Sequence, residues 1–101
     1  MIGLQNLPSS VASIVRELAF LASPKKIILF GSRARGDARQ NSDFDLCIVE
    51  KSCSDEEFTR LYNNLIELPN TLYQIDLIEF EKVSTAYQEN ILKEGVTLYE
   101  L

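Results

Sequence analysis

Two aspartates separated by a single phenylalanine constrain the fold of this chain more than any other feature. Asp43-Phe44-Asp45-Leu46 opens an apolar run in which carboxylates alternate with large apolar side chains. In a β-strand, residues i and i+2 point to the same face. Asp43 and Asp45 are therefore expected to direct two carboxylates to one spot, while Phe44 and Leu46 enter a core. The pattern predicts a strand with one buried face and one acidic face.

Two like charges at this spacing raise each other's pKa and destabilise a fold unless a positive charge lies between them. A divalent cation meets that need, and hard carboxylate oxygens favour Mg²⁺ or Mn²⁺. An isolated pair of this kind is more often one capping and one solvated aspartate. Asp76 adds support, because it lies inside the apolar run Gln74-Ile75-Asp76-Leu77-Ile78. Two interpretations stay open: Asp76 faces water from an edge strand, or it faces the first pair from a neighbouring strand.

A glycine and a serine end another apolar run. Lys25 to Phe30 (KKIILF) is predicted as a buried strand that leads straight into Gly31-Ser32. Glycine lets a ligand approach the backbone closely. The N–H groups of the turn and the Ser32 hydroxyl can hold phosphate oxygens, above all where a short helix begins. A Gly-Ser turn alone is weak support, and no Gly-Lys-Ser/Thr follows, so the turn is not a P-loop.

The hydrophobic periodicity of the remaining chain predicts a mixed α/β (α+β) fold. Helices are expected at 11–22 (with a serine N-cap), 55–68 and 84–94, and further strands at 72–80 and 96–99, the last at a sheet edge. The link between the first two strands has about 12 residues, the lower limit for a parallel crossover. A mixed sheet covered by helices, in one domain spanning residues 1–101, is therefore expected.

Charge and residue types narrow the chemistry. The net charge is −5, and an acidic surface repels phosphates, so no nucleic-acid partner is expected. The chain has no histidine, which removes Ser-His-Asp catalysis, Cys-His catalysis and imidazole-bound zinc. Two cysteines without metal-type spacing are expected to be reduced thiols in a cytoplasmic protein. No signal peptide and no membrane span is expected, because no apolar run approaches about 18 residues.

Taken together, these motifs resemble the polymerase-β-type nucleotidyltransferase superfamily. Its hallmark is an apolar residue, Gly-Ser, about ten residues, Asp-x-Asp, and a third Asp on a later strand; here Phe30-Gly31-Ser32 and Asp43-Phe44-Asp45 carry the first two parts. The segment GSRARGDARQNSDFDL resembles sequences of the minimal nucleotidyltransferase (MNT) branch. The segment Ile91-Leu92-Lys93-Glu94-Gly95 near the C-terminus resembles them as well. The core of the resemblance runs from about Lys25 to Phe80.

The resemblance implies a role for each motif residue. Gly31 and Ser32 would hold a nucleoside triphosphate. Asp43 and Asp45 would coordinate a pair of Mg²⁺ ions, or Mn²⁺ in their place. Asp76 would ligate the catalytic metal and orient or deprotonate the attacking hydroxyl, so that the three aspartates form the catalytic set.

Two arginines follow the Gly-Ser turn. The guanidinium of Arg33 or Arg35 suits phosphate, and both are candidate nucleotide-binding residues. Equally, they could be surface charges that balance Asp37 and Glu50. Asp37 itself is expected in a solvated loop.

The resemblance also implies an activity and a partner. The chain is expected to be an enzyme that moves AMP from ATP to a hydroxyl acceptor. Larger members of the superfamily have an extra domain for the acceptor, and no such domain is expected within these 101 residues. A partner protein is therefore expected, and the resemblance suggests a HEPN-domain protein as partner and acceptor, with this chain as the antitoxin of the pair in a homo- or hetero-oligomer. Two alternatives stay open: a non-catalytic antitoxin that acts by contact alone, and a small-molecule nucleotidyltransferase of the aminoglycoside type.

Overall fold

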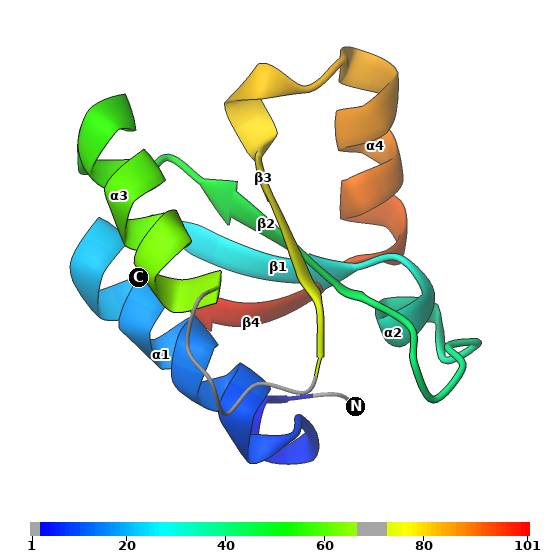
Figure 1. The fold of residues 1–101 in the computed structure, drawn as a ribbon. Helices are drawn as coiled ribbons and strands as arrows, with labels where there is room; N and C mark the ends of the chain where they lie inside the picture. Colours follow the sequence, from blue (N-terminus) through cyan, green and yellow to red (C-terminus); the bar gives the residue numbers. More distant parts are fainter. Residues whose placement is uncertain (1–2, 67–72) are drawn as a thin grey trace.

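The computed structural model describes residues 3–66 and 73–101, in which helices cover both faces of a four-stranded sheet (Figure 1). In chain order the elements are η1 (Leu4–Asn6), α1 (Ser9–Ala22), β1 (Lys26–Phe30), α2 (Ser32–Arg35), β2 (Phe44–Val49), α3 (Asp55–Ile66), β3 (Ile75–Glu79), η2 (Phe80–Lys82), α4 (Thr85–Glu94) and β4 (Val96–Glu100). None of the helices in these two ranges has the length and apolar character that crossing a membrane requires.

The sheet is mixed, as the short link between the first two strands predicts. Its order is β3-β2-β1-β4. The central strand β1 runs antiparallel to β2 and β4, and β2 runs parallel to β3. The predicted fold class is therefore confirmed, and the segment between β1 and β2 closes an antiparallel connection instead of a crossover.

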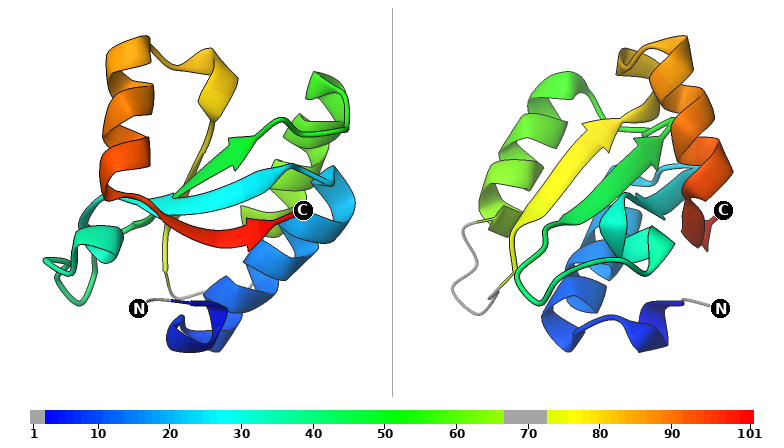
Figure 2. Two further views of the ribbon diagram at one scale, coloured as in Figure 1. Left: turned by 180° about the vertical axis from the view of Figure 1, so that it is seen from behind. Right: turned by 90° about the vertical axis from the view of Figure 1, so that its right-hand side faces the viewer.

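Strand alternation divides the core into two layers. Ile27 and Leu29 of β1 pack with α1 and α3, whereas Ile28 and Phe30 pack with Ile91 of α4. Figure 2 shows the same division, with α1 and α3 on one side of the sheet and α4 on the other. The α1/α3 side holds the larger cluster, and α4 covers only part of its face. That partly covered face is where polar side chains of β2 and β3 remain accessible.

The cap of the first helix and the bounds of the third strand differ most from the prediction. The expected serine cap of the first helix is wrong: Pro8 is the N-cap, its carbonyl accepts from Ala12 N–H at 2.9 Å, and no side chain caps the helix. The third strand starts at Ile75 instead of 72 and gives way to η2 at Phe80; residue 72 and the predicted end of the second long helix at 67–68 lie outside the described residues.

Gly95 ends α4 as predicted, but for an unexpected reason. Its φ is −74°, so the left-handed conformation that favours glycine is not used. Instead, a Cβ at this position would lie 2.4 Å from the Ile91 carbonyl oxygen and 2.5 Å from Ile28 Cγ2. Glycine is needed here because the end of α4 lies directly against β1.

The two cysteines differ in accessibility, which gives a first testable result. Both are free thiols; Cys47 is buried and Cys53 is half-buried. Burial, reinforced by the charge of Glu81, raises the pKa of Cys47 to about 12, and only the thiolate reacts rapidly with alkylating agents. We expect iodoacetamide at mildly alkaline pH to modify Cys53 slowly and Cys47 not at all in the folded chain, as read by peptide mass. Equal labelling in folded and urea-unfolded protein would contradict this.

Candidate active site

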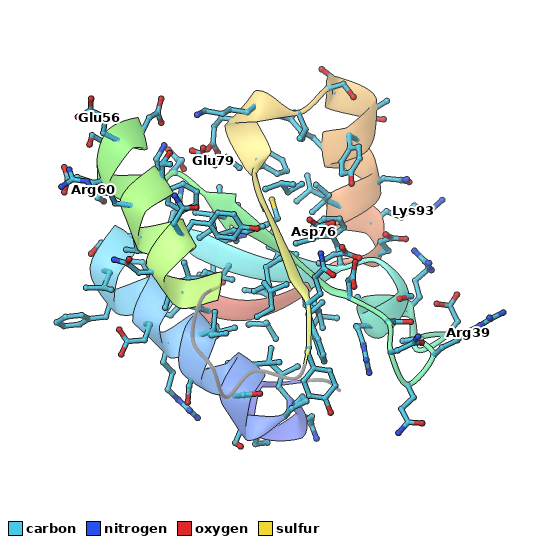
Figure 3. All side chains as sticks on the ribbon, in the orientation of Figure 1. Arg39, Glu56, Arg60, Asp76, Glu79 and Lys93 are labelled. Atoms are coloured by element: carbon cyan, nitrogen blue, oxygen red, sulfur yellow. The ribbon has the colours of Figure 1, made fainter. Side chains whose placement is uncertain are left out.

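Two of the three aspartates of the motif, Asp45 on β2 and Asp76 on β3, lie side by side in the sheet, and Asp43 lies directly before β2. Asp45 and Asp76 are direct partners in the parallel register of β2 and β3, and Asp43 precedes Asp45 by two residues. The next residue on this face of β2 is Cys47, which packs with Ile91 of α4. Figure 3 shows Asp76 projecting from β3 toward the side of the sheet on which α4 lies. Both interpretations of Asp76 hold together, because β3 is an edge strand, Asp76 is exposed, and it still lies beside Asp45.

Asp45 is half-buried and lies near the negative charges of both other aspartates. Its pKa is raised, first by burial and then by the charges of Asp76 and Asp43. Glu94 acts in the same direction, and Arg35 opposes it. Asp45 is therefore held in a position where its ionised form lacks a sufficient positive partner among the described residues.

Gly31 forms the wall of the site next to Asp45. Its φ of +74° is a conformation that L side chains rarely adopt, and a Cβ would lie 2.2 Å from Asp45 Oδ2. Only glycine therefore lets the Asp45 carboxylate lie against this turn. Gly31 is also the N-cap of α2. A short helix beginning at this turn is the arrangement that would favour phosphate binding. Within residues 3–66 and 73–101, the N–H groups of Ser32 and Arg33 donate no hydrogen bond.

A pocket of about 360 Å³ joins this turn to α4. Gly31, Ser32 and Asp45 line one side of it, and Tyr87 and Asn90 of α4 line the other. Tyr87 meets Phe30 edge to face, with ring centroids 6.1 Å apart. Larger hollows exist, such as the groove between α1 and α3, but that groove holds none of the three aspartates. The pocket beside Gly31 is therefore the candidate substrate site.

Glu94 is a site residue that the motif analysis missed. Its Oε1 accepts from Gly31 N–H at 3.2 Å, and its carboxylate pairs with Arg35 Nη1 at 3.2 Å. A glutamate in the last turn of a helix is disfavoured by the helix dipole. That misplaced charge at the end of α4 is the signal in the sequence that could have identified it.

The two arginines after the turn lie in different places. Arg35 is in the pocket wall, where it pairs with Glu94 and, at 3.2 Å, with Asp37. Arg33 turns away: its guanidinium lies 4.3 Å from the centre of the Phe44 ring, in the α1/α3 core layer. Of the two candidate phosphate contacts, only Arg35 therefore shares the pocket with Gly31 and Ser32. Asp37 is exposed, as expected for a loop residue, although it is paired.

The donor set suits a hard divalent cation. Asp43, Asp45 and Asp76 offer carboxylate oxygens, and a bound cation would favour the ionised form of Asp45, whose pKa is raised by burial and then by the charges of Asp76 and Asp43. Among the described residues, however, no three such side chains already lie close enough to hold an ion. The chemistry of the site fits Mg²⁺ or Mn²⁺, and further oxygen ligands are needed to complete the coordination.

The arrangement can be compared with known proteins. Residues 13–101 match the polymerase beta nucleotidyltransferase family. The chain belongs to this family. The predicted family and the enzyme class, a nucleotidyltransferase, are therefore confirmed, while the roles of the individual aspartates, Gly31, Ser32 and the arginines stay predictions.

Relatives of this nucleotidyltransferase place it near one branch. A candidate protein adenylyltransferase of Methanocaldococcus jannaschii is 35% identical over 82 residues, which is 74% of this chain and 78% of that protein. The protein adenylyltransferase MntA of Aphanizomenon flos-aquae is 33% identical over 89 residues, 75% of this chain but only 57% of MntA.

Solved structures agree with this placement. A candidate minimal nucleotidyltransferase superposes with a TM-score of 0.70 and 26% identity, covering 96% of this chain and 97% of that one. A structure of tri-AMPylated Shewanella oneidensis HEPN toxin in complex with MNT antitoxin superposes with a TM-score of 0.64 and 18% identity, covering 92% and 71%. At the latter identity the likeness shows the fold.

Proposed function

We propose that this nucleotidyltransferase transfers AMP from ATP, in a Mg²⁺-dependent reaction, to a hydroxyl group on a HEPN-type partner protein and thereby acts as its antitoxin. The observation that carries the proposal is the alignment of Asp45 with Asp76 beside the pocket of Gly31 and Ser32. The similarity to protein adenylyltransferases supports the choice of AMP.

The residues divide the work as follows in this proposal. The free N–H groups after Gly31, the Ser32 hydroxyl and Arg35 hold the triphosphate. A hydroxyl oxygen attacks the α-phosphorus, the bond to the β-phosphate oxygen breaks, and pyrophosphate leaves. Asp76, exposed at the sheet edge, accepts the proton of the attacking hydroxyl. A pair of Mg²⁺ ions held by Asp43, Asp45 and Asp76 would stabilise the attacking and leaving oxygens.

The acceptor is proposed to be another protein because the site is open on the side of Asp76. That aspartate lies on an edge strand and is exposed, so a partner can bring a hydroxyl to it from outside. The MNT antitoxin that this fold resembles is found with an AMPylated HEPN toxin. Two free thiols fit the reducing cytoplasm in which we place the pair.

A labelling experiment tests the proposal. The chain is incubated with Mg²⁺, ATP labelled in the α-phosphate, and a HEPN-domain protein from the same organism, in parallel with an Asp43→Asn/Asp45→Asn double variant. Label on the partner that disappears with the variant is the expected result. Toxin neutralisation that survives in the variant, without label transfer, would instead establish a non-catalytic antitoxin. Label transferred to an aminoglycoside but not to the protein would establish the small-molecule alternative.

The position of Arg35 gives a quantitative prediction for nucleotide binding. Loss of a charge-assisted hydrogen bond to a phosphate weakens binding by about 1.5–3 kcal/mol, so we expect Arg35→Gln to raise the Kd for ATP at least about 10-fold. Calorimetric titration with Mg-ATP measures it. Arg16→Gln on α1, an exposed arginine away from the pocket, removes the same charge and should leave the Kd unchanged; equal losses in both variants would show a general charge effect.

A further inference from the structure

The Arg33 side chain donates hydrogen bonds to the loop that precedes Asp43 and Asp45. This loop, residues 36–43, connects α2 to β2. Arg33 Nη2 donates to the carbonyl oxygens of Gln40 at 3.1 Å and Ser42 at 3.0 Å. Within the described ranges, these are the hydrogen bonds that join residues 39–42 to the rest of the chain, since the bonds between Arg39 and Ser42 are internal to the loop.

The contacts of Arg33 surround Asp43 on both sides in the sequence. One bond is made to Ser42, the residue before it, and the guanidinium lies over the ring of Phe44, the residue after it, at 4.3 Å. Tyr73 adds a second ring at 5.7 Å. A planar guanidinium can make both kinds of contact at once, because its fork of donors lies in the plane and its faces stack on aromatic rings.

The Arg33 side chain lies on the α1/α3 side of the sheet, opposite the side that carries Asp45 and Asp76. Phe44 and Leu29 belong to the α1/α3 core layer, and Arg33 lines a hollow there with Leu7 and Pro8. Its Nε is buried without a hydrogen-bond partner, and no ion pair with a described acidic residue involves it. The charge is thus directed to loop carbonyls and aromatic rings on the face opposite Asp45.

We infer that Arg33 is a positioning residue that fixes Asp43, and with it one corner of the metal site, by clamping Ser42 and Phe44. The inference rests on the proposed function in so far as Asp43 binds metal. Asp43 lies between the loop and β2. The first N–H of β2, that of Phe44, donates a hydrogen bond to the Gln74 carbonyl oxygen at 2.9 Å. The strand side is fixed by the sheet, and the loop side is fixed by Arg33.

Two measurements on Arg33→Lys and Arg33→Gln test the inference. Lysine keeps the positive charge, but its ammonium group is not planar. It cannot donate hydrogen bonds to the loop carbonyls and at the same time stack on the Phe44 ring as a guanidinium does. Amide exchange by NMR, without metal, should accelerate at Arg39 and Ser42, whose N–H groups bond within the loop, and stay unchanged in β1 and β4. Binding of Mn²⁺ alone, followed by electron paramagnetic resonance, should weaken at least about 10-fold, the usual effect of losing a group that orients a ligand.

Arg39→Gln is the matched control. Arg39 sits in the same loop, and its side chain projects away from the molecule (Figure 3), so the variant removes the same charge without removing the clamp. Loop exchange and Mn²⁺ binding at wild-type levels in both Arg33 variants, or equal losses in Arg39→Gln, would overturn the inference. Should Arg33→Gln fail to fold, Arg33→Lys carries both measurements. Absence of Mn²⁺ binding by the wild type would refute the metal site, while loop exchange would still decide the clamp.

Discussion

Gly31→Ala is expected to abolish nucleotidyl transfer while leaving a folded protein. Gly31 has a φ of +74°, and an added Cβ would lie 2.2 Å from Asp45 Oδ2. The Asp45 carboxylate and the turn at Gly31 cannot both keep their present positions. Either the Asp45 side chain is displaced from Asp43 and Asp76, or the N–H groups of the turn are displaced from the proposed phosphate site. Each displacement disrupts the substrate geometry, and small misplacements of reacting groups already reduce rates about 100-fold.

Gly36→Ala separates steric conflict from backbone strain. Gly36 also has a positive φ, +86°, but a Cβ there would meet nothing within 4 Å. Gly36→Ala should lose about 1–2 kcal/mol of unfolding free energy, because Gly36 is in the left-handed helical conformation. Gly31→Ala should lose at least as much, about 1–3 kcal/mol, because a φ of +74° with a ψ of −158° is a conformation that essentially only glycine adopts. Only Gly31→Ala should lose transfer of α-labelled AMP. If Gly36→Ala is equally inactive, strain in α2 and not contact with Asp45 explains the loss.

Local patterns predicted most of the site, because strand alternation is a local property. Alternation along β2 placed Asp45 opposite the buried Phe44 and Leu46, and Asp76 in its apolar run proved to be the register partner of Asp45. Asp43 lies one residue before β2, so that its shared face with Asp45 stays a prediction. The link at 31–42 correctly predicted a mixed sheet.

What the sequence could not supply depends on contacts between distant segments. Glu94 reaches Gly31 across a separation of 63 residues, and only the return of α4 to β1 brings them together. The sequence did not show which of the two arginines lies in the pocket. Arg35 lines the pocket and Arg33 packs against Phe44, and this difference depends on the direction in which the turn at Gly31 starts α2. The serine cap failed for a smaller reason: Pro8 already supplies the extended residue that starts the helix.

Asp45→Asn is expected to raise the free energy of unfolding and to abolish nucleotidyl transfer. The pKa of Asp45 is raised by burial and by Asp76 and Asp43, so its ionised form destabilises the folded state. A carboxyl whose folded pKa exceeds its unfolded value lowers stability as pH rises through that interval. Asparagine removes this penalty, so the variant should melt at a higher temperature than the wild type at pH 7 in EDTA.

Three further results should accompany that increase. The difference in melting temperature should shrink as the pH is lowered through the raised pKa of Asp45, because the wild-type side chain then becomes neutral as well. Addition of Mg²⁺ and ATP should stabilise the wild type more than the variant, since ligands that bind only the folded state raise its stability. Transfer of α-labelled AMP should fall by more than about 100-fold, beyond the usual effect of changing a group that merely orients a ligand.

Glu56→Gln controls for net charge, which is −5 for the whole chain. Glu56 lies in the first turn of α3, away from Asp76 (Figure 3), where a negative charge is favoured by the helix dipole. Its removal should slightly lower the melting temperature and leave transfer intact. A comparable rise in melting temperature for both variants would mean that total charge, and not the site, sets the effect. An Asp45→Asn variant less stable than the wild type in EDTA would mean that this carboxylate supports the fold, and the case for a cation-binding site on this face would be lost.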